Sequence, residues 1–130
     1  MTQSNRTYPE PSINIETEAY WAAAKEGRFL LKKCNACGET HYYPRAICPY
    51  CLSSETEWYE ASGKGTIYTY SVMRRGDTRY AIAYVTLDEG ITMMTNIVDC
   101  DLDTLAIGQA VEVTFKPTEG SQALPVFRPV

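Results

Sequence analysis

The chain has 130 residues, of which 45% are hydrophobic, and its formal net charge is −4. This length suits one ordinary domain or two small modules, and the apolar content excludes a chain that is disordered throughout. No run of eighteen apolar residues could cross a membrane, and the polar start of the chain lacks the apolar core of a secretion signal. We therefore expect a cytoplasmic protein.

The N-terminal part is predicted to be a tail followed by one short helix. Residues 1–14 are expected to form a flexible tail, because two prolines there favour extended backbone. The helix is predicted from about Thr17, a suitable N-cap, to Glu26, and Gly27 is placed to end it. Trp21 is expected to look outward from this helix, where it could pack on its own domain or dock into a partner.

Two Cys-x-x-Cys pairs, separated by ten residues, dominate the next segment: Cys34, Cys37, Cys48 and Cys51. Two residues between thiolates let one tight turn offer both sulfurs to one ion, and two such turns supply the tetrahedral sulfur set of structural zinc. Disulfides or free thiols are the alternatives, but a cytosolic setting fits thiolates that hold a metal better than it fits disulfides. We predict one structural Zn²⁺ per chain in a closed site, flanked by strands at residues 28–33 and 41–45.

Two further residues could in principle join the metal site or act as a nucleophile. His41 is a potential ligand, but four cysteines already complete the site. Cys100 lies between Asp99 and Asp101, whose carboxylates should raise the pKa of the thiol rather than lower it. We interpret His41 as structural and Cys100 as a turn residue.

The pattern changes to strands alone after the breaker Gly63-Lys64-Gly65. The expected modules are therefore a helix plus zinc ribbon over residues 15–62 and a barrel over residues 63–130. The run at residues 80–87 is almost continuously apolar, as expected for a strand covered on both faces. Five strands in about 65 residues, with no long helix, suit a small Greek-key barrel of the OB type. The predicted strands are 56–60 beside the ribbon, then 66–74, 80–87, 91–98, 111–116 and 124–128, with a turn or short helical turn at 102–108.

Three barrel motifs accompany the helix and the ribbon: Gly63-x-Gly-Thr-x-Tyr68, Gly108-x-x-Val-x-Val-x-Phe115 and Pro125-Val-Phe-Arg-Pro129. Together they resemble the zinc-ribbon plus OB-fold family that was long catalogued as a domain of unknown function and is found beside thiolase-like proteins. The resemblance runs from about residue 20 to residue 129. Its most specific part is the ribbon with Pro44-Arg45 and Cys48-Pro49.

The resemblance implies a mostly β fold, with a rubredoxin-like zinc ribbon on a five-stranded OB barrel. It also implies a non-catalytic accessory subunit of thiolase-like or aldolase-like enzymes that helps to form their acyl-CoA site. Some relatives are fused to a hot-dog hydratase domain, which this sequence does not contain, so the partner enzyme stays open.

The residues themselves also argue against an enzyme that acts alone. Catalysis would need a nucleophile, a positioned acid or base, or an open metal site. His41 is the single histidine and lies beside a closed site, and no pair of carboxylates stands at a suggestive spacing. We therefore predict that the isolated chain has no activity.

Contacts with a ligand or partner are expected from basic and aromatic residues, because the phosphates of coenzyme A require Arg or Lys and interfaces favour Trp, Tyr and Arg. Any single cation is better interpreted as a solvated surface charge, whereas the dense cluster at residues 74–79 suggests a role with an anion or a partner. The candidate residues are Trp21, Arg28, Lys32, Lys33, Tyr43, Arg45, Arg74, Arg75 and Arg79.

Two other functions compete with the accessory role. Ten tyrosines and an OB barrel could bind single-stranded nucleic acid through base stacking. However, residues 52–130 carry eleven Asp and Glu against six Lys and Arg, which does not favour a phosphate backbone. The third possibility is a purely structural assembly module that binds no ligand.

Overall fold

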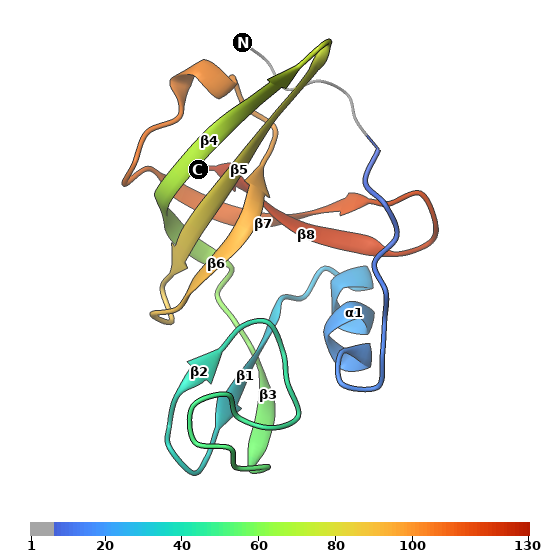
Figure 1. Ribbon diagram of the computed structural model, residues 1–130, viewed down its shortest axis with the longest axis vertical. Helices are drawn as coiled ribbons and strands as arrows, with labels where there is room; N and C mark the ends of the chain where they lie inside the picture. Colours follow the sequence, from blue (N-terminus) through green and yellow to red (C-terminus); the bar gives the residue numbers. More distant parts are fainter. Residues whose placement is uncertain (1–6) are drawn as a thin grey trace.

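The computed structural model describes residues 7–130. Within them a closed five-stranded barrel lies above a three-stranded sheet in Figure 1, and helix α1 lies beside their junction. The predicted mostly β architecture, with an N-terminal helix, a ribbon and an OB barrel, is confirmed. No helix in this described range is long and apolar enough to span a membrane.

Helix α1, Glu18–Lys25, follows Thr17 and ends before Gly27, which adopts the left-handed conformation with φ 75°. The prediction that Trp21 looks outward is wrong, because its side chain is only 5% exposed. The reason is that α1 is covered from two directions. Residues 42–43 of the ribbon pack on it from one side, and the barrel segment around Gln122 covers it from another.

The ribbon sheet has the strand order β2-β1-β3 and is antiparallel throughout. Its strands are β1, Leu30–Cys34, β2, Thr40–His41, and β3, Thr56–Glu60. The predicted return strand at residues 41–45 is wrong, since β2 ends at His41. Tyr42 and Tyr43 turn toward α1 instead, and Pro44 has no N–H to donate to a ladder.

The barrel closes in the order β4-β5-β6-β8-β7. A 3-10 turn, η1, Leu102–Thr104, connects the strands that are third and fourth along the chain, β6 and β7. All five strands were predicted and differ by at most two residues at their ends. They are β4, Lys64–Arg75, β5, Thr78–Leu87, β6, Thr92–Ile97, β7, Ala110–Pro117, and β8, Ala123–Pro129.

Strand β5 is not covered on both faces, contrary to the prediction from its apolar run. Alternate residues such as Ala81 and Val85 point into the barrel and are fully buried. The other set, which includes Ile82 and Tyr84, points outward, and Tyr84 is 44% exposed. The apolar outer face of β5 is thus available to form a site.

The ribbon and the barrel share one hydrophobic core rather than two. Phe29, just before β1, meets Phe127 of β8 edge to face, with ring centroids 6.0 Å apart. Tyr20 of α1 packs on the other side of Phe29 with centroids 6.2 Å apart. Because all three side chains are buried, helix, ribbon and barrel are packed against one another.

The segment before α1 also contacts the barrel. The expected flexible tail covers residues 1–14, of which residues 1–6 lie outside the described part. Tyr8 is buried and pairs with Thr118, and the Glu10 carboxylate accepts hydrogen bonds from Thr118 and from the amide of Gln122. Residues 8–10 are therefore attached to the β7–β8 hairpin.

Candidate metal centre and adjoining groove

Two turns of the same shape carry the four cysteines. In the first, the amide of Gly38 donates to the carbonyl of Cys34 at 2.9 Å, and in the second the amide of Leu52 donates to the carbonyl of Cys48 at 3.0 Å. Gly38 and Leu52 are both left-handed, with φ of 79° and 67°. Glycine adopts this conformation without strain, whereas leucine does so at a cost. The second turn therefore keeps the shape of the first without using glycine.

The sulfur atoms lie at distances that fit a metal ion. All four Sγ atoms are within 4.8 Å of one another, and the pairs Cys34–Cys51 and Cys37–Cys48 are 3.6 Å and 3.7 Å apart. A tetrahedral Zn²⁺ with Zn–S bonds of about 2.3 Å holds its sulfurs about 3.8 Å apart. Among the described residues this is the one group of His, Cys, Asp and Glu side chains that could hold a metal.

The electrostatics of the cysteines also favour a cation. Burial opposes ionisation of Cys48, but the amides of Cys51 and Tyr50 donate to its sulfur and the pKa is lowered to about 7. The amide of Glu39 favours the thiolate of Cys37, yet burial and the neighbouring thiols raise the pKa of Cys37 to about 12. Four thiolates this close repel one another, so all four ionise only with a cation between them.

His41 takes no part in this cluster, in agreement with its structural interpretation. It is almost fully buried, and its Nε2 accepts a hydrogen bond from the amide of Arg45 at 3.2 Å. Burial lowers the pKa of His41. The histidine thus holds the start of the segment that leads from the first pair of cysteines to the second.

Two tyrosines in that segment connect the ribbon to α1. The hydroxyls of Tyr42 and Tyr20 are 3.2 Å apart, and the indole Nε1 of Trp21 donates to the hydroxyl of Tyr43 at 2.9 Å. Burial raises the pKa of both Tyr20 and Tyr42, which therefore stay neutral. The rings of Tyr42 and Tyr43 also meet edge to face, with centroids 5.5 Å apart.

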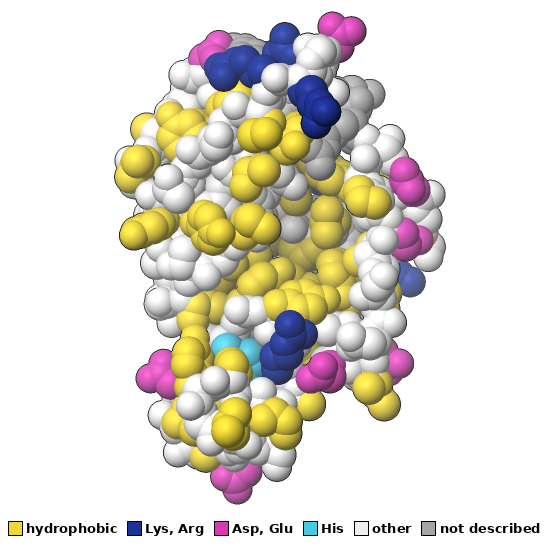
Figure 2. All heavy atoms as spheres, in the orientation of Figure 1, with side chains coloured by type: hydrophobic (Ala, Val, Ile, Leu, Met, Phe, Trp, Pro, Cys, Tyr) yellow, Lys and Arg dark blue, Asp and Glu magenta, His cyan; other side chains and the backbone are white. Residues whose placement is uncertain are grey.

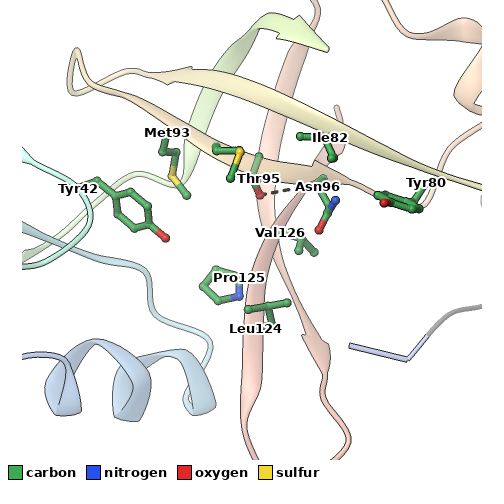
Figure 3. A pocket seen from close by; sticks show the side chains of 10 residues that line it. Tyr42, Tyr80, Ile82, Met93, Thr95, Asn96, Leu124, Pro125 and Val126 are labelled. Atoms are coloured by element: carbon green, nitrogen blue, oxygen red, sulfur yellow. Dashed lines mark hydrogen bonds between the residues drawn. The ribbon is translucent and has the colours of Figure 1, made fainter. Parts of the chain in front are cut away.

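A groove of about 370 Å³ opens where Tyr42 meets the outer face of the barrel. Figure 2 shows a hollow between the barrel above and the ribbon below, with hydrophobic side chains gathered in it. Figure 3 shows Met93 beside the ring of Tyr42 and places Tyr80 farther from the ribbon. The lining residues are Tyr42, then Tyr80 and Ile82 of β5, Met93, Met94, Thr95 and Asn96 of β6, and Leu124, Pro125 and Val126 of β8.

The groove exists because β6 and β8 part from each other. These two strands pair at Ile97 and Phe127 alone, in parallel, and the amide of Val98 donates to the carbonyl of Phe127 at 2.8 Å. The next bridge of a parallel ladder in this register, between Thr95 and Pro125, would need the amide of residue 125 to donate to the carbonyl of Met94. Pro125 has no amide hydrogen, so the ladder ends there and the strands diverge.

The lining can bind but has little means to catalyse. It contains no His, Cys, Lys, Asp or Glu side chain. The amide nitrogen of Asn96 donates to the carbonyl of Ala81 at 3.0 Å, and the Thr95 hydroxyl has no general base among the lining residues. The site therefore suits an apolar ligand or a partner side chain.

Sequence reasoning missed these groove residues. The available signals were the apolar residues in both alternating sets of residues 80–87, and a proline within the predicted last strand. Neither identifies a groove until β6 and β8, which are far apart in the sequence, are placed side by side.

The predicted basic contacts lie at two ends of the molecule. Arg74, Arg75 and Arg79 belong to the β4–β5 hairpin, whose tip lies far from the ribbon in Figure 1. Arg74 pairs with Asp103 at 3.7 Å, and Arg79 donates to the carbonyls of Gly76 and Thr78. This hairpin cluster is partly occupied with its own loop.

The remaining basic candidates are on or beside the ribbon. The guanidinium of Arg45 lies 5.6 Å from the centre of the Tyr43 ring, next to the groove residue Tyr42. Arg28 is bridged to two glutamates, Lys33 lines a separate shallow pocket, and Lys32 is buried over the ring of Trp58. Of the predicted ribbon cations, Arg45 is the one that contacts Tyr43, the chain neighbour of the groove residue Tyr42.

Cys100 is separate from the metal cluster. Burial, together with Asp101 and Asp99, raises the pKa of its thiol. This agrees with the prediction of a turn residue rather than a nucleophile.

Comparison with known proteins gives the family. The rubredoxin-like zinc ribbon domain of ChsH2 matches residues 21–57, and the C-terminal OB-fold domain of ChsH2 matches residues 58–116. A solved structure described as the Ltp2–ChsH2(DUF35) aldolase is 33% identical, with a TM-score of 0.80 over 92% of this chain and 98% of that one. The chain belongs to the DUF35 family.

Relatives within and around the DUF35 family carry several names. A DUF35 domain-containing scaffold protein of Methanothermobacter thermautotrophicus is 38% identical over 65% of this chain and 68% of its own length. The benzoylsuccinyl-CoA thiolase subunit BbsA of Geobacter metallireducens is 29% identical over 91% and 85%. A probable enoyl-CoA hydratase alpha subunit of Thermomonospora curvata is 33% identical over 93% of this chain, which spans 40% of that protein.

Proposed function

We propose that this chain is a non-catalytic subunit that binds a thiolase-like or aldolase-like enzyme and helps to form its acyl-CoA site. The observation that carries the proposal is the groove beside Tyr42, which is largely apolar and contains no His, Cys, Lys, Asp or Glu side chain. Related proteins named as a scaffold, a thiolase subunit and the ChsH2 of an aldolase support the accessory role. The proposed setting is the cytoplasm, where reducing conditions keep cysteines available for a metal.

We infer that the metal is Zn²⁺, one per chain, held by Cys34, Cys37, Cys48 and Cys51. Four sulfur ligands at tetrahedral spacing are the donor set that zinc takes in structural sites. Bound there, zinc would supply folding energy to the ribbon and no open position for a substrate. The role of the cysteines is thus to fix the ribbon beside the barrel.

The acyl-CoA part of the proposal rests on chemical fit. The acyl chain, together with the extended arm of coenzyme A to which it is attached, would bury apolar surface in the groove. The phosphates of coenzyme A would need a cation at the rim, and Arg45 stands next to Tyr43 at the ribbon end.

Binding to a thiolase-like or aldolase-like protein, identified in the neighbouring reading frames or by pull-down, tests the proposal. Met94 is 60% exposed and lines the groove, so Met94→Glu should weaken binding without unfolding the barrel. Met73, which is 38% exposed on β4 and outside the groove, gives the matched control Met73→Glu. Calorimetric titration should show at least a tenfold loss for Met94→Glu alone, about 1.4 kcal/mol. Equal affinity for all three proteins would contradict the proposal.

Single-stranded nucleic acid is the second candidate, and one observation favours it. Tyr68 and Tyr84 are 66% and 44% exposed on the outer face of β4 and β5, as stacking platforms would be. The acidic balance of the barrel opposes it, because backbone binding requires a basic face. A titration with single-stranded oligonucleotides that shows tight, salt-dependent binding would favour this function over the accessory role. If the chain binds the enzyme but no acyl-CoA, the result would favour the third possibility, a purely structural assembly module.

A further inference from the structure

One residue of the ribbon, Tyr42, belongs to the wall of the groove. In the sequence it lies between the two cysteine pairs, five residues after Cys37 and six before Cys48. In space its ring stands beside Met93 of β6 (Figure 3). The metal site and the groove are thus connected through a single short segment.

That segment has little secondary structure to hold it. No regular strand or helix is assigned between His41 and Thr56 in the described chain. Besides the two cysteine turns and the contacts of Tyr42 and Tyr43 with α1, three hydrogen bonds hold its course. The amide of Arg45 donates to His41, the amide of Ala46 donates to the Glu16 carboxylate at 2.6 Å, and the hydroxyl of Thr56 donates to the carbonyl of Ala46 at 3.0 Å. Since the segment enters and leaves through metal-binding turns, its path depends on whether the four sulfurs are held together.

The contacts of this segment continue into the other wall of the groove. Tyr43 accepts the indole N–H of Trp21, and the carbonyl of Trp21 accepts a hydrogen bond from Nε2 of Gln122 at 2.8 Å. Gln122 is buried and directly precedes β8, which supplies Leu124, Pro125 and Val126 to the lining. In Figure 3 Tyr42 lies beside Met93 of the β6 wall, whereas Tyr43 is connected to the β8 wall through α1.

We propose that metal binding by the four cysteines sets the shape of the groove by fixing Tyr42 and Tyr43. With the metal bound, Tyr42 closes the ribbon end against Met93, and Tyr43 holds α1 and the start of β8 in place. Without the metal, the tyrosine segment loses its fixed path and the ribbon end of the groove opens. The groove is therefore formed only in the metal-loaded protein, whichever ligand or partner occupies it.

Methionine methyl groups allow a direct test in the full chain. Met93 and Met94 lie in the groove, whereas Met73 lies on β4 outside it. Protein labelled with ¹³C at the methionine methyls would be compared by NMR before and after a zinc chelator removes the metal. We expect the Met93 signal to move most, since it loses the Tyr42 ring, Met94 to move less, and Met73 to stay unchanged. Restoring Zn²⁺ should restore the first spectrum.

A second variant separates the proposed route from a general loosening. In Tyr42→Ala the ring that faces Met93 is already absent, so metal removal should shift Met93 much less than in the wild type. Tyr59→Phe is the matched control, because it removes a hydroxyl that pairs with Thr40 elsewhere in the ribbon sheet. It should keep the wild-type response.

Three results would overturn the proposal. Unchanged Met93 and Met94 signals after metal removal would show that the groove does not depend on the metal. A Met73 signal that moves as far as Met93 would show that the metal holds the whole chain rather than one wall. An undiminished Met93 shift in Tyr42→Ala would show that Tyr42 is not the route. None of these results depends on the proposed accessory role.

Discussion

Trp21 gives the sharpest test of how the three parts of the molecule are packed. Its ring is buried between Tyr20, at 5.0 Å between centroids, and the Tyr43 hydroxyl, at 2.9 Å from Nε1. Trp21→Ala would empty this volume and remove the hydrogen bond. Large-to-small substitution of a buried Trp costs about 3–5 kcal/mol of folding stability. Trp21→Phe retains most of the apolar surface and loses mainly the hydrogen bond, for about 1 kcal/mol.

Urea unfolding followed by circular dichroism would measure these losses. All samples need the same free zinc concentration, because metal binding contributes to the stability. Tyr68→Ala is the control, since an aromatic side chain that is 66% exposed should cost within about 0.5 kcal/mol. A loss below about 1 kcal/mol for Trp21→Ala would refute the packing described here and would restore an outward-facing tryptophan.

Three further outcomes follow from the metal site, the tail and the isolated thiol. Elemental analysis should find about one zinc per chain in the wild type and far less in Cys34→Ser. In this variant the ribbon should unfold while the barrel keeps the circular dichroism signal of its strands. Wild-type protein that contains no metal would contradict the site. The hydrogen bond from Thr118, together with those from the amides of Gln122 and Ser121, lowers the pKa of the Glu10 carboxyl group. The ionised carboxylate therefore stabilises the fold above its ordinary pKa of 4.5, and this contribution is lost as the pH falls through the lowered pKa. Acid unfolding of Glu10→Gln should therefore show a smaller loss of stability below pH 4.5 than the wild type, and identical curves would contradict that role. Cys100, whose pKa burial and two aspartates raise, should react with iodoacetamide at neutral pH more slowly than free cysteine in mass spectrometry, and immediate modification would contradict its inert setting.

Short-range patterns in the sequence were enough to predict the ribbon and the barrel strands. The two Cys-x-x-Cys pairs place their sulfurs through local turns, and alternation such as that around Val111 and Val113 marks a strand without knowledge of its neighbours. These features depend on residues within one turn or one strand. Their prediction therefore agreed with the structure, apart from shifts at strand ends and the short β2.

The features that could not be predicted from the sequence depend on contacts between segments that are distant along the chain. Trp21 is buried because Tyr43 and Gln122 reach α1 from the ribbon and from the barrel. The groove depends on the divergence of β6 and β8 at Pro125. Helix periodicity and strand alternation describe which face a residue occupies but not what covers that face, so neither result could be predicted from them.

Reconstitution of enzyme activity tests the central claim most directly. A thiolase-like or aldolase-like protein that co-purifies with this chain would be assayed with acyl-CoA substrates on its own, with the wild-type chain, and with Met94→Glu or Met73→Glu. We predict that the chain alone turns over no acyl-CoA, that the wild type and Met73→Glu raise the partner's activity, and that Met94→Glu raises it far less. A partner that is fully active without the chain, or turnover by the purified chain alone, would contradict the account.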